Sequence, residues 1–225
     1  TGEVPTKDEV NAMTSAQIVD NIKVGWNLGN TLDSYNTNSS DTETGWGNPK
    51  TTKAMIETVQ KAGFNAIRIP VTWGEHMSAD GTIDAAWMAR VKEVVDYAYD
   101  AGLYVVLNVH HDDALWLIPT NDKLESDKAT LTNIWKQICA TFQDYDHRLI
   151  FEGMNEPRVI GSATEWSGGT PEEREIINQL FQAFVDTVRA AGGTHAERTL
   201  IVSSHAQSIT EAAVSAVKVP NDSHV

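Results

Sequence analysis

Residues 149–158 read LIFEGMNEPR and pass from an apolar run to a polar cluster within four residues. Residues 149–151 have the length and composition of a buried strand. Pro157 has no N–H group to donate to a sheet, and it disfavours helical backbone at the preceding Glu156. We therefore expect a strand that ends just before Asn155 and Glu156, which would place an amide and a carboxyl group at its carboxyl end.

Similar apolar runs recur along the chain, and amphipathic helical patterns separate them. The other predicted strands are residues 22–26, 64–69, 103–109 and 199–202. Apolar residues at i, i+3 and i+4 spacing predict helices around residues 55–59, 87–98, 131–142 and 176–188. The last of these helices has a clear start, because Thr170 is a candidate N-cap, Pro171 suits the first turn and Glu173 completes a capping box.

Strand–helix alternation predicts a parallel sheet with helices outside it, which both doubly wound folds and barrels satisfy. A doubly wound nucleotide-binding fold would show a glycine-rich G-x-G-x-x-G turn after its first strand. Here the first strand runs into NLGN at residues 27–30, and polar residues follow each strand instead. Barrel enzymes carry their sites at the carboxyl ends of the strands. The predicted fold class is therefore α/β, a (β/α)8 TIM barrel.

The spacing of the predicted strands indicates how much of the barrel these residues form. The strands recur about every 44 residues, so eight units need roughly 350 residues, within the range of this fold. The 225 residues then supply about the first five βα units. Because an open sheet leaves two unpaired edges, we expect residues 1–225 to be part of one catalytic domain that continues beyond 225. A partner chain or self-association could complete the barrel instead.

Composition narrows the classes of partner. The net charge of −14 disfavours binding to nucleic acid and to anionic membranes, whereas neutral sugars are not disfavoured. No apolar run is long enough to span a membrane, and no signal peptide is visible in the chain, which opens at Thr1. Cys139 is the single cysteine, so we expect no internal disulfide and a buried, apolar role for its side chain.

Glu156 is the candidate catalytic acid. A carboxyl group at the carboxyl end of a barrel strand could protonate a glycosidic oxygen, and the Asn155 amide could hydrogen-bond a sugar hydroxyl. The alternative is that Glu156 is a solvated loop acid. Asn-Glu-Pro is a short motif, and its position at a strand end is what favours catalysis.

His110 and His111 follow the third predicted strand. His110 could bind substrate or orient a carboxylate, whereas a metal site is the competing hypothesis. Adjacent residues of a strand point to opposite faces, so we do not expect these two histidines to bind one ion. No metal and no cofactor is predicted.

Arg68 is a charged residue inside an apolar strand, so it requires a partner. A catalytic nucleophile outside the chain is the favoured carboxylate, and a structural ion pair with Glu152 is the alternative. Either carboxylate would be held ionised by the guanidinium.

Seven tryptophans are many for a chain of this length. Trp87 and Trp135 fall in helical stripes and are predicted to lie in the core. The others stand at strand ends or in the following loops, where sugar stacking and packing are equally plausible. These are Trp26, Trp46, Trp73, Trp116 and Trp166.

Several of these segments, in this order, resemble the family 5 glycoside hydrolases, in particular their bacterial and rumen-type endoglucanases. The matching stretches are residues 25–33 (GWNLGNTLD), 45–49 (GWGNP), 63–73, 105–112 and 149–158. One match would mean little, whereas five in family order are specific. The resemblance implies a (β/α)8 barrel and retaining hydrolysis of β-1,4-glucans by an extracellular enzyme.

The resemblance also implies roles for catalytic residues. Glu156 matches the family's acid/base, and Asn155 matches the asparagine that contacts the sugar 2-hydroxyl. Arg68 and His110 match positions that support the nucleophile and the bound sugar.

The implied substrate-binding residues are Asn27 and His111 on the glycone side and Trp166 on the aglycone side. Trp46, in one of the matching stretches, is a further candidate for substrate binding. The polysaccharide could be cellulose or, alternatively, xyloglucan, mannan or lichenan, because subsite loops set this choice.

The chain departs from the family pattern beyond its fifth strand. The family's His-x-Tyr after the sixth strand and its nucleophilic glutamate after the seventh have no counterpart, and neither Glu75 nor Glu165 matches. Retaining chemistry needs two carboxyl groups about 5–5.5 Å apart. We therefore expect the nucleophile to lie outside these residues, which would leave this chain alone inactive; an inactive half-barrel that binds sugar is the alternative.

Overall fold

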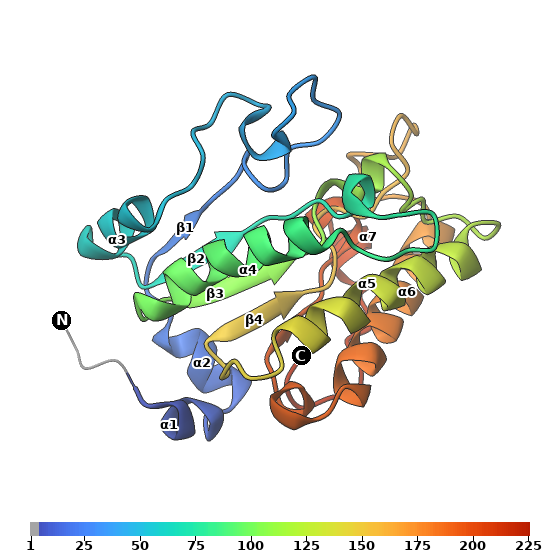
Figure 1. Cartoon of the computed structure of the whole chain (residues 1–225). Coiled ribbons are helices and arrows are strands. Elements are labelled where there is room, and N and C mark those ends of the chain that lie inside the picture. Colours follow the sequence, from blue (N-terminus) through green and yellow to red (C-terminus); the bar gives the residue numbers. More distant parts are fainter. Residues whose placement is uncertain (1–4) are drawn as a thin grey trace.

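The computed structural model describes residues 5–225, so residues 1–4 of the predicted domain lie outside the described part. Within it, five parallel strands form one sheet in the order β1-β2-β3-β4-β5 (Figure 1). The strands are β1 (Gly25–Asn27), β2 (Ala66–Ile69), β3 (Tyr104–Asn108), β4 (Leu149–Glu152) and β5 (Leu200–Ile201). Each strand overlaps its predicted apolar run. Four of them are shorter than the run, and β4 extends one residue beyond it.

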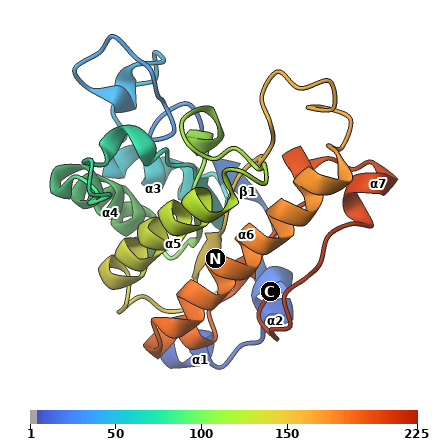
Figure 2. The same ribbon diagram turned by 90° about the vertical axis from the view of Figure 1, so that its right-hand side faces the viewer.

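The helices that follow the strands lie on one face of the sheet, as Figures 1 and 2 show together. They are α3 (Lys53–Lys61), α4 (Ala85–Asp100), α5 (Leu124–Thr141) and α6 (Pro171–Ala190), and the short α7 (Glu211–Val214) follows β5. Each strand pairs with the next in sequence, and the order never reverses. A doubly wound sheet would reverse its order and carry helices on both faces. The prediction of the first five βα units of a (β/α)8 barrel is confirmed.

Short 3-10 helices occupy several of the loops. They are η1 (Thr42–Thr44), η2 (Gly74–His76), η3 (His111–Ala114), η4 (Gly193–Ala196) and η5 (His205–Gln207). Three of them, η2, η3 and η5, follow the carboxyl ends of β2, β3 and β5.

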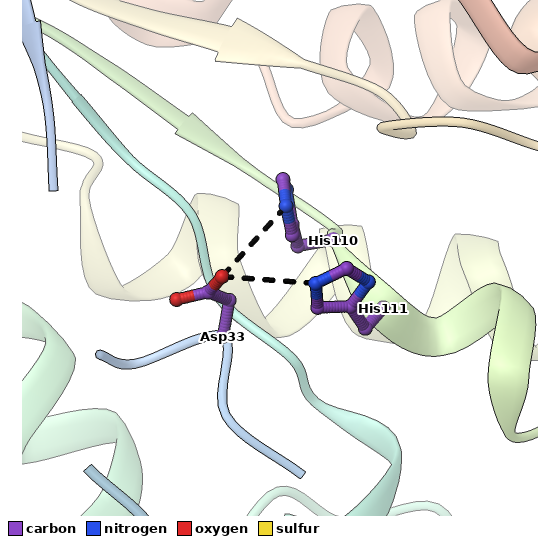
Figure 3. Close-up of side chains that lie close together, drawn as sticks. All are labelled: Asp33, His110 and His111. Atoms are coloured by element: carbon purple, nitrogen blue, oxygen red, sulfur yellow. Dashed lines mark ion pairs between the residues drawn. The ribbon is translucent and has the colours of Figure 1, made fainter. Parts of the chain in front are cut away.

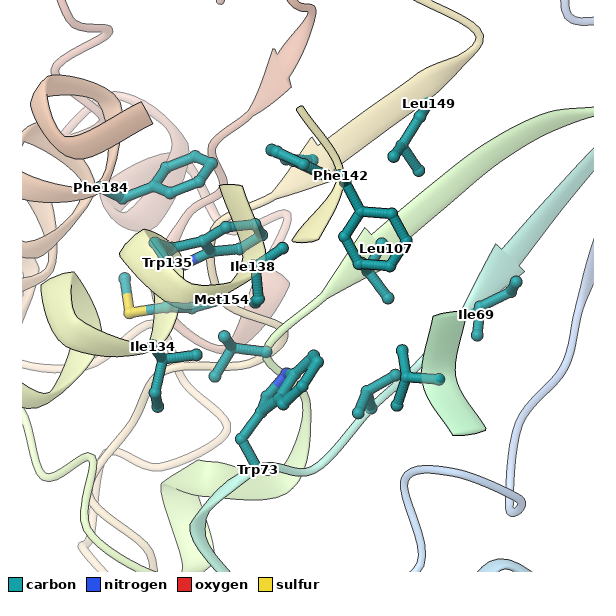
Figure 4. Packing of buried hydrophobic residues seen from close by; sticks show 14 of the residues in the cluster. Ile69, Trp73, Leu107, Ile134, Trp135, Ile138, Phe142, Leu149, Met154 and Phe184 are labelled. Carbon is teal, nitrogen blue, oxygen red and sulfur yellow. The ribbon is translucent and has the colours of Figure 1, made fainter. Parts of the chain in front are cut away.

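The outer face of the sheet packs against the helices and forms the main core (Figure 4). Leu107 and Phe151 of the sheet are fully buried there, together with Trp135 and Phe184 of α5 and α6. Trp87 is also buried, so the core placement of both helical tryptophans is confirmed. Cys139 is free and buried, as expected.

The inner face is closed at its amino end by the first two helices, α1 (Lys7–Asn11) and α2 (Ser15–Asn21). Val10 and Ile18 of these helices form a second apolar cluster with Ala66, Tyr104 and Ile150 of three neighbouring strands. Because alternate residues of a strand share a face, this cluster identifies which strand residues point into the barrel.

Helix α6 begins as its sequence predicts. Thr170 Oγ1 accepts the Glu173 N–H at 3.2 Å, and Glu173 Oε2 accepts the Thr170 N–H at 2.7 Å. This capping box satisfies two backbone groups at the start of a 20-residue helix. No helix of residues 5–225 has the length and apolarity that crossing a membrane requires.

Candidate active site

Three polar side chains stand at the carboxyl end of the inner sheet face. Arg68, Asn108 and Glu152 each lie an even number of residues beyond a member of the inner apolar cluster, such as Ala66 or Ile150. They therefore share its face and point into the barrel above it. Asn108 and Glu152 are also direct partners in the register of β3 and β4.

Glu152 accepts hydrogen bonds from three residues, Arg68, Asn108 and Gln207. Arg68 donates to it through Nε at 2.6 Å and Nη2 at 2.8 Å. Asn108 Nδ2 lies 3.3 Å from Oε2, and Gln207 Nε2 lies 3.1 Å from Oε1. The residue is only 3% exposed, so these donors replace the water that a carboxylate would otherwise bind. Glu152 is thus a fully engaged structural anion and not a free nucleophile.

The observed partner of Arg68 is the carboxylate that the sequence analysis named as the alternative. The bidentate ion pair is made with Glu152 on β4, and a contact of Arg68 with a nucleophile outside the chain stays a prediction. Burial explains this outcome, because both side chains point into the barrel, where each needs the opposite charge.

Arg68 also orients two amides that the sequence singled out. Its Nη2 donates to Asn155 Oδ1 at 2.8 Å, and its Nη1 donates to Asn27 Oδ1 at 3.1 Å. Since both side-chain oxygens are used in this way, each asparagine presents its NH2 group to a ligand. Asn27 is exposed on β1, whereas Asn155 is 5% exposed.

Glu156 follows β4 at the same end of the sheet and is partly open, with a side chain 34% exposed. Its Oε2 lies 3.4 Å from Arg158 Nη1, which also donates to the Glu156 carbonyl at 2.9 Å. Arg158 forms further ion pairs with Asp113 and with Glu165, the latter at 3.0 Å. Its positive charge is therefore shared among three carboxylates, and the Glu156 carboxyl stays accessible beside it.

His110, His111 and Asp33 converge on one point, as Figure 3 shows. Asp33 Oδ2 lies 3.8 Å from His110 Nε2 and 3.7 Å from His111 Nε2. Asp33 is held by the backbone N–H groups of Asn30 and Thr31 at 3.0 and 2.7 Å. Ligand atoms of the three side chains lie within 4.8 Å of one another, which is the arrangement of a candidate cation site.

The reason that we gave for separating the two histidines is therefore wrong. Strand β3 ends at Asn108, and His111 begins η3, so strand alternation does not apply to them. Their rings are 4.4 Å apart at an angle of 79°. The expectation of no metal remains a prediction.

Burial keeps His110 neutral. The side chain is removed from water, and His111 and Arg68 lie nearby, which together lower the pKa of His110 to about 2. A neutral imidazole carries one N–H donor and one bare nitrogen, so His110 acts through hydrogen bonds and not through charge.

Three of the loop and strand-end tryptophans are exposed. Trp46 is 40% exposed and lies edge-on to Tyr35, with His111 5.5 Å from its ring centre. Trp166 is 64% exposed and stacks over Arg158 at 4.5 Å. Trp26 is 45% exposed on edge strand β1, but it pairs with Ile67 of the outer sheet face and therefore lies outside this site. An exposed indole held by a neighbour is a flat surface available for stacking.

The other two tryptophans are structural. Trp73 is fully buried, and its Nε1 donates to the Asn108 carbonyl at 2.9 Å. Trp116 packs against the core and donates to Asp112, which also accepts the backbone N–H groups of Trp73 and Gly74. Asp112 thereby joins the loops that follow β2 and β3, and for these two indoles packing is the outcome.

Sequence reasoning missed Asp33, Asn108 and Gln207 as members of this site. Asn108 carried a signal, because it is a polar residue at the end of an apolar strand. Gln207 carried none, since it reaches Glu152 from a segment in which Ala206 and Gln207 have φ values of 49° and 50°. Non-glycine residues in this left-handed region are uncommon and cluster at functional sites.

The fold and the site together define a class. A partly exposed carboxyl, oriented amides, neutral imidazole and exposed indoles line the carboxyl end of a parallel barrel sheet. These side chains suit acid-assisted chemistry on a neutral, hydroxyl-rich ligand, and they are typical of the active site of a barrel glycoside hydrolase.

Comparison with known proteins agrees with this class. The family model "Cellulase (glycosyl hydrolase family 5)" matches residues 30–225. The chain belongs to glycosyl hydrolase family 5.

Relatives and solved structures give the same assignment. The chain is 46% identical to "Endoglucanase A" of Ruminococcus albus, over 96% of this chain and 60% of that protein. It is 48% identical to "Cellulase/esterase CelE" of Acetivibrio thermocellus, over 93% of this chain and 25% of that protein. A "GH5-4 broad specificity endoglucanase" from Clostridium longisporum superposes with a TM-score of 0.92 at 45% identity, covering 95% of this chain and 63% of that one. The chain thus spans less than two thirds of these relatives.

Proposed function

We propose that this chain is the N-terminal part of the catalytic domain of an endo-acting, retaining β-1,4-glucanase, with Glu156 as general acid/base. The observation that carries the proposal is the partly exposed Glu156 carboxyl beside Asn155 at the carboxyl end of β4. Asn155 is anchored by Arg68 and by its own N–H, which donates to the Val109 carbonyl at 2.9 Å. Rigid support of this kind keeps catalytic groups in productive geometry.

The proposed reaction needs a second carboxylate. That carboxylate bonds to the anomeric carbon as the glycosidic C–O bond breaks, and Glu156 gives its proton to the departing oxygen. Glu156 then takes a proton from the water that attacks the same carbon and releases the sugar. Glu152 does not suit the attacking role, because its oxygens are engaged by Arg68, Asn108 and Gln207. We place the nucleophile in protein beyond residue 225.

The proposed substrates are cellulose, carboxymethylcellulose and related β-glucans, without a cofactor. One solved relative is described as a xyloglucan-specific endo-β-1,4-glucanase in complex with cellotriose; it is 48% identical, with a TM-score of 0.90. Its description supports a β-glucan ligand and keeps xyloglucan as a candidate. Since polymeric glucans do not enter cells, we place the enzyme outside the cell.

The test of function is Glu156→Gln in the complete enzyme. The amide cannot donate a catalytic proton, so we expect turnover of carboxymethylcellulose to fall by about 10²–10⁴-fold. An aryl cellobioside with a good leaving group needs less protonation, so its glycosylation step should be reduced much less. The matched control is Glu57→Gln on the exposed surface of α3, which should retain full activity. Equal loss on both substrates in that step would contradict the acid role.

A second arrangement is supported by the edge strand. Val24 and Trp26 are each 45% exposed beside the unpaired edge of β1. We propose that another segment or a second copy of the chain covers this edge, since exposed edges invite pairing. Size-exclusion chromatography of the 225-residue chain tests self-association: a dimer that dissociates on Trp26→Lys supports it, and a stable monomer contradicts it.

A further inference from the structure

We propose that Asn108 is a positioning residue that fixes the tautomer of His110, so that the imidazole presents an Nε2–H donor to the site. The tautomer assignment follows from the geometry alone. Its consequence for catalysis rests on the proposed glucanase function.

The orientation of the Asn108 amide is set by a backbone group. Its Oδ1 accepts the Val71 N–H at 3.1 Å, and its Nδ2 lies 3.3 Å from Glu152 Oε2. A flipped amide would turn its NH2 group toward an N–H donor and its oxygen toward a carboxylate. Both contacts would then be repulsive, and the residue is fully buried, so water cannot relieve them.

The oriented amide determines which ring nitrogen of His110 carries the proton. Asn108 Nδ2 lies 2.9 Å from His110 Nδ1. An amide NH2 group can only donate, so Nδ1 must be bare to accept its hydrogen bond. A doubly protonated ring has no bare nitrogen, so an Nδ1 that accepts a hydrogen bond also makes the ring neutral. The single ring proton therefore resides on Nε2.

The Nε2–H group lies on the side of Asp33, with Nε2 3.8 Å from Asp33 Oδ2 (Figure 3). His110 consequently offers a donor to a ligand oxygen, whereas Asp33 offers an acceptor. Binding of a cation would require a bare Nε2. This tautomer therefore disfavours a cation between Asp33, His110 and His111.

Asn108 also couples His110 to the buried ion pair. The path runs from Arg68 to Glu152, from Glu152 to Asn108 and from Asn108 to His110, and every member has a defined donor direction. Glu152 anchors one amide hydrogen and Val71 anchors the amide oxygen. The Glu152 carboxylate on β4 therefore helps to hold the ring proton of His110 on Nε2.

The experiment is ¹⁵N NMR of the complete enzyme labelled at histidine. The His110 signals are assigned by their loss in His110→Gln. We expect Nδ1 to resonate as a bare ring nitrogen and Nε2 as a protonated one. A proton on Nδ1 in the unsubstituted enzyme would overturn the proposal, and the variant serves only to assign the signals.

Asn108→Asp is the perturbing variant, because a carboxylate accepts from Nδ1 where the amide donates. We expect a proton to appear on Nδ1, and we expect kcat/KM on carboxymethylcellulose to fall about 10–100-fold. The control is Asn178→Asp, the same change at a largely buried asparagine of α6 that bonds only the backbone of Ala216 and Lys218. It should leave the His110 signals and the activity unchanged.

The outcomes separate this proposal from the proposed function. A protonated Nε2 in an enzyme that hydrolyses no β-glucan would support the tautomer and contradict the glucanase assignment. An active enzyme whose His110 signals are unchanged by Asn108→Asp would contradict the positioning role.

Discussion

The losses of unfolding free energy caused by substituting Arg68 and by substituting Glu152 should not be additive. Arg68→Met leaves the Glu152 carboxylate inside the barrel without its opposite charge, and the carboxylate side chain is only 4% exposed. Breaking one partner of a buried pair costs about 3–5 kcal/mol. Because the Arg68 side chain is 26% exposed, we expect the lower end, about 3 kcal/mol.

Removing both charges should cost less than the sum of the two single changes. In R68M/E152L no charge is left unpaired, and the remaining loss is the hydrogen bonds of four side chains to this pair, those of Asn27, Asn108, Asn155 and Gln207. At about 1 kcal/mol for each bond, the double variant should lose about 4 kcal/mol. The sum of the singles, about 6 kcal/mol, exceeds this by about 2 kcal/mol, which is the expected coupling energy.

Urea unfolding of the complete enzyme, followed by tryptophan fluorescence, measures this cycle. The matched control is the surface pair Lys61–Glu57, whose charges are 3.6 Å apart with side chains 72% and 40% exposed. Its coupling should stay below about 1 kcal/mol. Additive losses at Arg68 and Glu152, or singles that cost less than about 1 kcal/mol, would refute the view that the two side chains form a coupled buried ion pair.

Three further predictions concern other parts of the structure. Burial raises the pKa of Asp112 to about 6, so the folded state retains a proton that the unfolded chain releases near pH 4. Asp112→Asn should therefore lower the unfolding free energy, relative to the unsubstituted enzyme, more at pH 4 than at pH 7. A difference that is the same at both pH values, or larger at pH 7, would contradict this. Trp166→Ala should weaken binding of long glucans about 2–10-fold in calorimetry. The melting temperature should stay nearly constant, because the indole is 64% exposed. Unchanged affinity would show that Trp166 does not bind the glucan. Cys139 is 2% exposed, and burial raises its pKa to about 12. A thiol reagent should therefore label it only at the rate of unfolding. Rapid labelling of the native enzyme would disprove its core placement.

The order of elements and the position of Glu156 were predictable because they depend on local patterns. Strand and helix periods depend on consecutive residues, and Pro157, which cannot donate to a sheet, indicates a loop around Glu156 whatever the rest of the chain does. The strand itself ends earlier than expected, at Glu152. The capping box of Thr170 and Glu173 is likewise local, and the structure confirms it. Parallel strands in sequence order then bring their carboxyl ends together, which is why a candidate site at that end followed from sequence.

The pairings within the site were not predictable in this way. Whether Arg68 meets Glu152 depends on the register between strands that are 84 residues apart, and no local signal encodes that register. The histidine pair was misjudged for a related reason, since the face of His111 depends on β3 ending at Asn108. Asp33 and Gln207 arrive from other loops, one of them through left-handed backbone.

By itself, therefore, the sequence determined a parallel α/β barrel sheet, a helix-covered outer face and a carboxyl group at the end of the fourth strand. Only the tertiary structure decided which charges neutralise each other, which tryptophans face solvent and which nitrogen of His110 holds its proton. The physical reason is that periodicity and turn chemistry act over a few neighbouring residues. Burial, opposite charge and donor direction act between side chains that only the folded sheet brings within 3 or 4 Å of each other.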